Sequence, residues 1–152
     1  MKASLACAIA GAVLALSAPA FAQDGPPSLL GAWRMTSLQV TGADGKVTGI
    51  PYTGQVVFSP AGTLSVQAMD LDPKAAPTTY TLNGYEAYYG PVKVDEGART
   101  FTITVESSLV RNLIGQKLTR VFAVSPDQLV ITPADPAETW RVTYTRMGSE
   151  GR

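Results

Sequence analysis

Strict alternation of apolar and polar residues is the feature that most constrains the fold of this chain. In the stretch 100–106, Thr-Phe-Thr-Ile-Thr-Val-Glu, the side chains of Phe101, Ile103 and Val105 fall on one side and the threonines on the other. Successive side chains of a strand point to opposite faces, so this spacing predicts a half-buried β-strand.

Short runs of strand type, separated by turn signals, recur along the chain, and no long helical pattern is found. The expected strands are 33–40, 55–59, 63–69, 91–95, 100–106, 116–124, 129–132 and 139–146. The stretch 70–79 is expected to be a surface loop, and 80–89 a helical turn or irregular structure. Eight strands with short connections predict an all-β fold, an eight-stranded antiparallel up-and-down barrel, because closure removes exposed sheet edges. A flat sandwich is the alternative architecture.

The N-terminal segment 1–22 has the three parts of a cleavable signal peptide. Lys2 gives the positive start, an apolar run follows at 5–16, and Ala-Phe-Ala ends the segment at Ala22. The run is shorter than the about 20 apolar residues that a membrane helix needs. Cys7 precedes most of the run, which favours cleavage over lipidation. The rest divides into a leader at 23–28, a barrel domain at 29–147 and a tail at 148–152.

A cleaved signal predicts a protein that works in the periplasm or is secreted. The segment after Ala22 contains neither cysteine nor histidine. This absence excludes a cysteine nucleophile, a Ser-His-Asp triad and a histidine base, and it excludes zinc, copper or haem sites built on those residues. The few acids, among them Glu86, Asp95 and Glu106, are not spaced as an acid–base pair. We therefore expect no catalytic residue, no metal, no cofactor and no enzymatic activity.

Charge and hydropathy limit the partners. The whole chain has 12 basic and 12 acidic residues, whereas nucleic-acid binding needs a basic surface. No second apolar run is long enough for an integral membrane span. The expected partner is a small molecule, and the expected state is a monomer, with a dimer as the alternative.

A Gly-x-Trp motif stands at Gly31 and Trp33, at the start of the first expected strand. With this motif and the stretches 30–34, 60–66, 85–90, 104–107, 112–115, 118–120 and 140–146, the chain resembles the lipocalin-like domain family of calycin-type barrels over roughly residues 29–146. The Gly-x-Trp signature is typical of the first strand of such barrels. Where this family commonly carries histidines, the chain has Ile103 and Thr104. The resemblance implies a barrel with a cavity, but it does not imply one ligand or one reaction.

The same resemblance implies structural roles for Gly31, Trp33 and one arginine. In calycin barrels the signature tryptophan packs across the closed end beneath an arginine of a late strand. Arg146 is the better candidate for that stacking partner, and Arg120 is the other. Arg120 shares a face with Leu118 and Phe122 and is expected to point inward. It is expected either to stack on Trp33, to pair with Glu106, or to anchor a ligand carboxylate.

The leading hypothesis is an exported barrel that binds a small hydrophobic or amphipathic ligand in its cavity. Two alternatives remain: an interaction or inhibitor barrel with a filled core, and a cofactor-free isomerase or cyclase. Small residues such as Ser37 and Ser65 hint at open space inside. The candidate ligand-binding residues are Tyr85, Tyr88, Tyr89, Phe101, Ile103, Arg120, Phe122, Trp140 and Tyr144.

Overall fold

The computed structural model describes residues 28–148. The expected signal peptide at 1–22, most of the leader and most of the tail lie outside these residues. Within the described part, no helix is long and apolar enough to cross a membrane.

The described chain is almost entirely β-structure, with one short 3₁₀ turn. The strands are β1 (Gly31–Thr41), β2 (Val47–Ile50), β3 (Tyr52–Phe58), β4 (Thr63–Asp70), β5 (Tyr85–Asp95), β6 (Thr100–Thr104), β7 (Ser107–Ser108), β8 (Lys117–Val124), β9 (Gln128–Pro133) and β10 (Trp140–Arg146), with the turn η1 at Arg111–Leu113.

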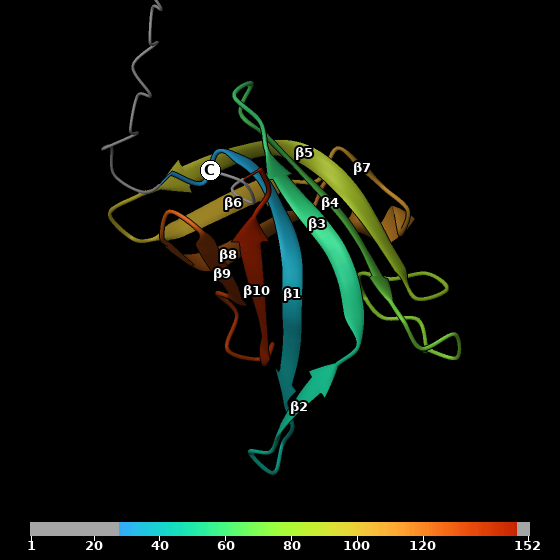
Figure 1. The fold of residues 1–152 in the computed structure, drawn as a ribbon. Helices are drawn as coiled ribbons and strands as arrows, with labels where there is room; N and C mark the ends of the chain where they lie inside the picture. Colours follow the sequence, from blue (N-terminus) through green and yellow to red (C-terminus); the bar gives the residue numbers. More distant parts are fainter. Residues whose placement is uncertain (1–27, 149–152) are drawn as a thin grey trace, which may run out of the picture.

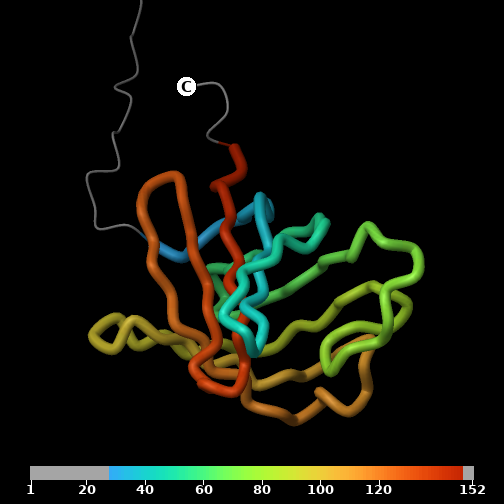
Figure 2. The backbone as a smooth tube through the Cα atoms, turned by 90° about the horizontal axis from the view of Figure 1, so that it is seen from below, coloured from blue at the N-terminus to red at the C-terminus, as the bar shows by residue number. Residues whose placement is uncertain are grey.

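Eight of these strands form a closed antiparallel barrel (Figures 1 and 2). Around the barrel the order is β1, β3, β4, β5, β6, β8, β9 and β10, and β10 then pairs with β1. In that closing pair Trp33 lies opposite Arg146 near one end, and Val40 lies opposite Trp140 near the other. The predicted up-and-down barrel is confirmed, and the sandwich is not the architecture. The short strands β2 and β7 only extend the edges of β1 and β5.

The expectation for 80–89 was wrong over its second half. Tyr85 begins β5, an 11-residue strand that continues through Gly90 and Pro91. A Cβ on Gly90 would collide with the backbone carbonyl of Thr104, so glycine allows β5 to approach the end of β6 closely. Pairing of β5 with β4 over seven residues, from Thr63 to Met69, overrides the weak local strand propensity.

Two small residues expected to face inward do not. A register shift in the β1–β10 pairing between Met35 and Ser37 is a β-bulge, after which Leu38 and Val40 line the interior. On β4 the buried residues are Leu64, Val66 and Ala68, so Ser65 has the opposite, outward parity. The interior space therefore does not come from these serines.

Apolar side chains fill one end of the barrel. Trp33 is fully buried there, and the rings of Phe58 and Phe101 meet edge to face with centroids 5.2 Å apart. Phe122 packs obliquely on Phe101 at 6.4 Å. Leu129 is also fully buried in this cluster. Toward the opposite end, where Val40 and Trp140 pair, the interior opens.

Candidate functional site

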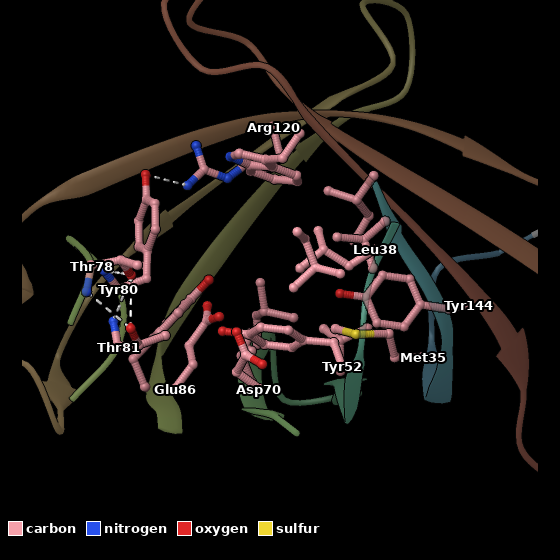
Figure 3. A pocket seen from close by; sticks show the side chains of 18 of the residues that line it. Met35, Leu38, Tyr52, Asp70, Thr78, Tyr80, Thr81, Glu86, Arg120 and Tyr144 are labelled. Carbon is pink, nitrogen blue, oxygen red and sulfur yellow. Dashed lines mark hydrogen bonds between the residues drawn. The ribbon is translucent and has the colours of Figure 1, made fainter. Parts of the chain in front are cut away.

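The interior contains a cavity of about 400 Å³ that extends from the middle of the barrel to the end where Val40 pairs with Trp140. Its wall is mostly apolar, with a few polar side chains among them, including Arg120, Glu86 and Asp70 (Figure 3). The lining residues are Met35, Leu38, Val40, Ile50, Tyr52, Val56, Leu64, Val66, Asp70, Thr78, Tyr80, Thr81, Glu86, Tyr88, Phe101, Ile103, Arg120, Ile131, Trp140, Val142 and Tyr144.

The closed end is held by Arg146 and Trp33. The guanidinium carbon of Arg146 lies 3.9 Å from the Trp33 ring centroid, a cation–π contact. Arg146 donates hydrogen bonds from Nε to the Pro126 carbonyl (2.6 Å) and from Nη1 to the Leu30 carbonyl (2.8 Å). Gly31 has a φ of 113°, and a Cβ there would lie 3.3 Å from Arg146 Nη1. Arg146, rather than Arg120, is thus the arginine that stacks on Trp33.

Arg120 reaches the cavity from β8 and is compensated there. Its side chain is buried, with the residue 6% exposed, and forms an ion pair with Glu138 at 3.4 Å. Nη2 donates to the Tyr80 hydroxyl at 3.0 Å, drawn as a dashed line in Figure 3, and Nη1 donates to the Thr119 carbonyl. The guanidinium also faces the rings of Tyr80 and Trp140, at 5.5 and 5.0 Å.

Glu138 connects this group to two further residues. Its Oε2 accepts hydrogen bonds from the Tyr80 hydroxyl (2.7 Å) and from Trp140 Nε1 (2.8 Å). Tyr80 therefore donates to Glu138 and accepts from Arg120, which fixes the loop between β4 and β5 to β8 and to the loop before β10. Glu106 is exposed and is not the partner of Arg120. We call Arg120, Glu138, Tyr80 and Trp140 the rim network.

A second polar group lies on the wall formed by β3, β4 and β5. Figure 3 shows Glu86, Asp70 and Tyr52 converging on the cavity. Tyr52 lies directly opposite Asp70 across the β3–β4 pair, and Glu86 lies opposite Ala68, two residues from Asp70. Asp70 Oδ1 accepts the backbone N–H of Asp72 at 2.9 Å. We call Glu86 and Asp70 the carboxylate pair.

Burial perturbs the protonation of this wall. Desolvation raises the pKa of Glu86 from 4.5 to about 7, although hydrogen bonding with Tyr88 and the charge of Arg120 act in the opposite direction. Burial, together with the charges of Glu86 and Asp70, raises the pKa of Tyr52 to about 12. Burial also raises the pKa of Tyr88 and Tyr144. The tyrosines are therefore neutral hydrogen-bonding groups at physiological pH.

Most of the predicted ligand-binding residues meet in the cavity. Those that line it are Tyr88, Phe101, Ile103, Arg120, Trp140 and Tyr144. Tyr85 and Tyr89 are instead on the outer face, 38% and 43% exposed, because alternation along β5 turns them away from Glu86 and Tyr88. Phe122 is buried in the filled core beside Phe101 and does not line the cavity. These three placements correct the sequence-based set.

The sequence-based set also missed Glu86, Asp70, Tyr52, Tyr80 and Glu138. For Glu86 a signal existed, since it has the same strand parity as Tyr88 two residues later. Glu138 lies in the loop before β10, and no periodicity points to it. Within residues 28–148, no three Asp, Glu, His or Cys side chains are grouped closely enough to hold a metal ion.

The comparison with known protein families matches a lipocalin-like domain over residues 30–150. The chain belongs to this lipocalin-like domain family. No curated protein matches the lipocalin-like chain. Among solved structures, an uncharacterized protein from Bacteroides eggerthii is similar to it with 15% sequence identity, covering 78% of this chain and 99% of that one, at a TM-score of 0.48.

Proposed function

We propose that this lipocalin-like barrel binds a small hydrophobic or amphipathic molecule in its cavity, without a covalent step and without a cofactor. The observation that carries the proposal is the largely apolar cavity of about 400 Å³ inside an otherwise filled barrel. Small-molecule sites usually have volumes of about 300–1,000 Å³ and apolar walls with a few convergent polar groups. The cavity has both properties.

The open interior favours this function over an interaction barrel with a filled core. Protein interiors pack to crystal-like density, and empty space of this size is uncommon in them. The rim network keeps its buried charges paired without help from a partner. Val56, Leu64 and Ile103 line the cavity with apolar side chains. Covering this apolar surface with a ligand removes it from water, which favours binding.

A cofactor-free isomerase or cyclase is the second candidate, favoured by one observation. Glu86 faces the cavity beside Tyr88 with a pKa of about 7, near the value that suits a general acid or base. Mass spectrometry of a molecule recovered after incubation separates the two functions. A binder returns the molecule unchanged, whereas an enzyme returns a product, and Glu86→Gln abolishes the conversion.

Titration with the neutral fluorescent probe N-phenyl-1-naphthylamine tests the binding function. The barrel is expected to enhance and saturate the fluorescence at about one probe per chain. Val66→Phe places a larger side chain in the cavity wall and is expected to weaken binding by about tenfold or more. The matched control is Gln67→Phe, because Gln67 is the next residue and points outward. Equal binding by both variants would contradict binding in the cavity.

The proposal includes export of the protein from the cytoplasm. Lys2, the apolar run 5–16 and the Ala-Phe-Ala end support it. Intact-mass analysis after expression of the full chain tests this part. A mature protein beginning at Gln23 in the periplasmic or secreted fraction is expected. A full-length chain in the cytoplasm would contradict export.

A further inference from the structure

The charges that line the cavity are unevenly compensated. Among the described lining residues, Arg120 is the one cation, and it pairs with Glu138, which lies outside the lining set. Two nitrogens of its guanidinium already donate to Thr119, Tyr80 and Glu138. An additional anion at Arg120 would compete with Glu138, which is itself fixed by Trp140 and Tyr80. The cavity has no uncompensated positive charge in the described chain.

The carboxylate pair has no such partner. No lysine or arginine of residues 28–148 forms an ion pair with Glu86 or Asp70. Glu86 interacts with the Tyr88 hydroxyl, and Asp70 with one backbone N–H. Among the described lining residues Glu86 and Asp70 are the acids, and Arg120, whose charge also acts on Glu86, is already paired with Glu138. Above its pKa of about 7 Glu86 is ionised, and the lining then carries a net negative charge. A negative field in a poorly hydrated space favours a cation strongly.

The aromatic side chains on the same wall add to this preference. Tyr52 and Tyr88 line the cavity next to the carboxylate pair. The faces of aromatic rings attract cations, and neutral phenol oxygens accept hydrogen bonds from ammonium groups. Farther in, Val56, Leu64, Phe101 and Ile103 offer only apolar surface. The cavity is thus divided into an acidic, aromatic part and an apolar part.

We infer that the natural ligand is a cationic amphiphile, whose protonated amine lies against Glu86 and Asp70 and whose apolar body fills the space beside Leu64 and Ile103. The inference rests on the proposed binding function and adds the chemical class of the ligand. It replaces the sequence-based idea that Arg120 anchors a ligand carboxylate. Arg120 instead belongs to the wall, where the rim network holds it.

The test compares three probes with the same tail: decylamine, 1-decanol and decanoate. Isothermal titration calorimetry of the purified protein, below the concentrations at which the probes form micelles and at about pH 8, measures their affinities. We expect decylamine to bind about tenfold more tightly than 1-decanol, and decanoate to bind most weakly. Glu86→Gln should lower the affinity for decylamine by about tenfold and change the affinity for 1-decanol by no more than about twofold.

The matched control is Glu106→Gln, which removes an exposed carboxylate outside the cavity and should change none of the affinities. If the three probes bind equally, or decanoate binds most tightly, the cationic class is overturned and the binding function stands. If decylamine is preferred but Glu86→Gln and Asp70→Asn both keep that preference, the assignment to the carboxylate pair is overturned. If no probe binds, both the inference and the proposed function are overturned.

Discussion

Arg120 and Glu138 form an ion pair of 3.4 Å at the rim of the cavity, with the arginine side chain 7% exposed and the glutamate 25% exposed. Glu138 also accepts hydrogen bonds from Tyr80 and Trp140. Removing one partner of such a pair leaves the other charge without compensation in a poorly hydrated place. The pair therefore stabilises the open end and keeps the positive charge of Arg120 compensated at the cavity wall.

Glu138→Gln is expected to reverse part of the ligand preference. The substitution keeps the size of the side chain but leaves Arg120 uncompensated, so decanoate should gain several-fold in affinity and decylamine should lose. The free energy of unfolding should fall by roughly 1–3 kcal/mol. Calorimetry and urea unfolding measure the two effects. Glu96→Gln, in an exposed turn, is the control, and an unchanged decanoate affinity would contradict the compensating role.

Tyr80→Phe is expected to loosen the loop between β4 and β5. The hydroxyl makes two hydrogen bonds, one to Glu138 and one from Arg120, and their loss should cost about 1–2 kcal/mol. Amide hydrogen exchange should become faster at Thr78 and Leu82, whose N–H groups bond within this loop and to the start of β5. Tyr85→Phe, on the outer face, should leave those rates unchanged. Equal rates in both variants would show that the rim network does not hold the loop.

Glu86 should make the stability depend on pH with a defined sign. Its folded pKa, about 7, is above the ordinary 4.5, so the folded state keeps a proton that the unfolded chain has lost. The free energy of unfolding therefore falls as pH rises from 4.5 to about 7 and stays lower above that range. Glu86→Gln should remove this fall, making the variant roughly 1–3 kcal/mol more stable than wild type at about pH 8.

Urea unfolding at about pH 5 and about pH 8 measures this difference. The titratable and charged groups of this cavity around Glu86 are Arg120 from β8, Asp70 from β4, Tyr52 from β3, Tyr144 from β10 and Tyr88 on its own strand. Asp70→Asn is the comparison, since it removes a carboxylate from the same wall. A wild-type stability that rises between the two pH values while Glu86→Gln does not would contradict the burial of a protonated Glu86.

The free energy of unfolding should depend on Arg146, at the closed end, far more than on an exposed arginine of the same strand. Arg146→Ala removes the cation–π contact with Trp33 and three hydrogen bonds to carbonyl oxygens, including that of Ser28. The expected loss in unfolding free energy is about 2–4 kcal/mol. Arg141→Ala, on the exposed side of the same strand, should cost less than about 0.5 kcal/mol. Similar losses in urea unfolding would contradict the structural role of Arg146.

Alternation allowed much of the barrel to be predicted from the sequence. It identified the inward faces of the strands that contain Phe101, Arg120 and Tyr144, and all three residues are buried. It failed where geometry changes the parity: the bulge between Met35 and Ser37 turns Ser37 outward. No local pattern marks such a bulge, because tertiary pairing decides its position.

The chemistry of the site was less predictable than its position. Glu86 breaks the rule that inward residues are apolar, so a search for apolar lining passes over it. Glu138 comes from the loop between β9 and β10 and meets Arg120 because β9 pairs with β8, where Pro133 lies opposite Arg120. The second half of β5 was predicted as the strand 91–95, but its first half, before Pro91, was not, although the tyrosines there did supply one cavity residue, Tyr88. The alternation pattern of a single strand does not show which side chains from distant elements will meet.

Methyl-resolved NMR titration with decylamine tests the central claim, binding inside the cavity, most directly. The inward methyl groups of Leu64, Ile103 and Val142 line the cavity, whereas Val94 and Val121 are 41% and 37% exposed on the outside. We expect large, saturating shifts for the inward methyl groups and almost none for the outward ones. Shifts confined to Val94 and Val121, or no saturable shift at all, would contradict a ligand-binding cavity.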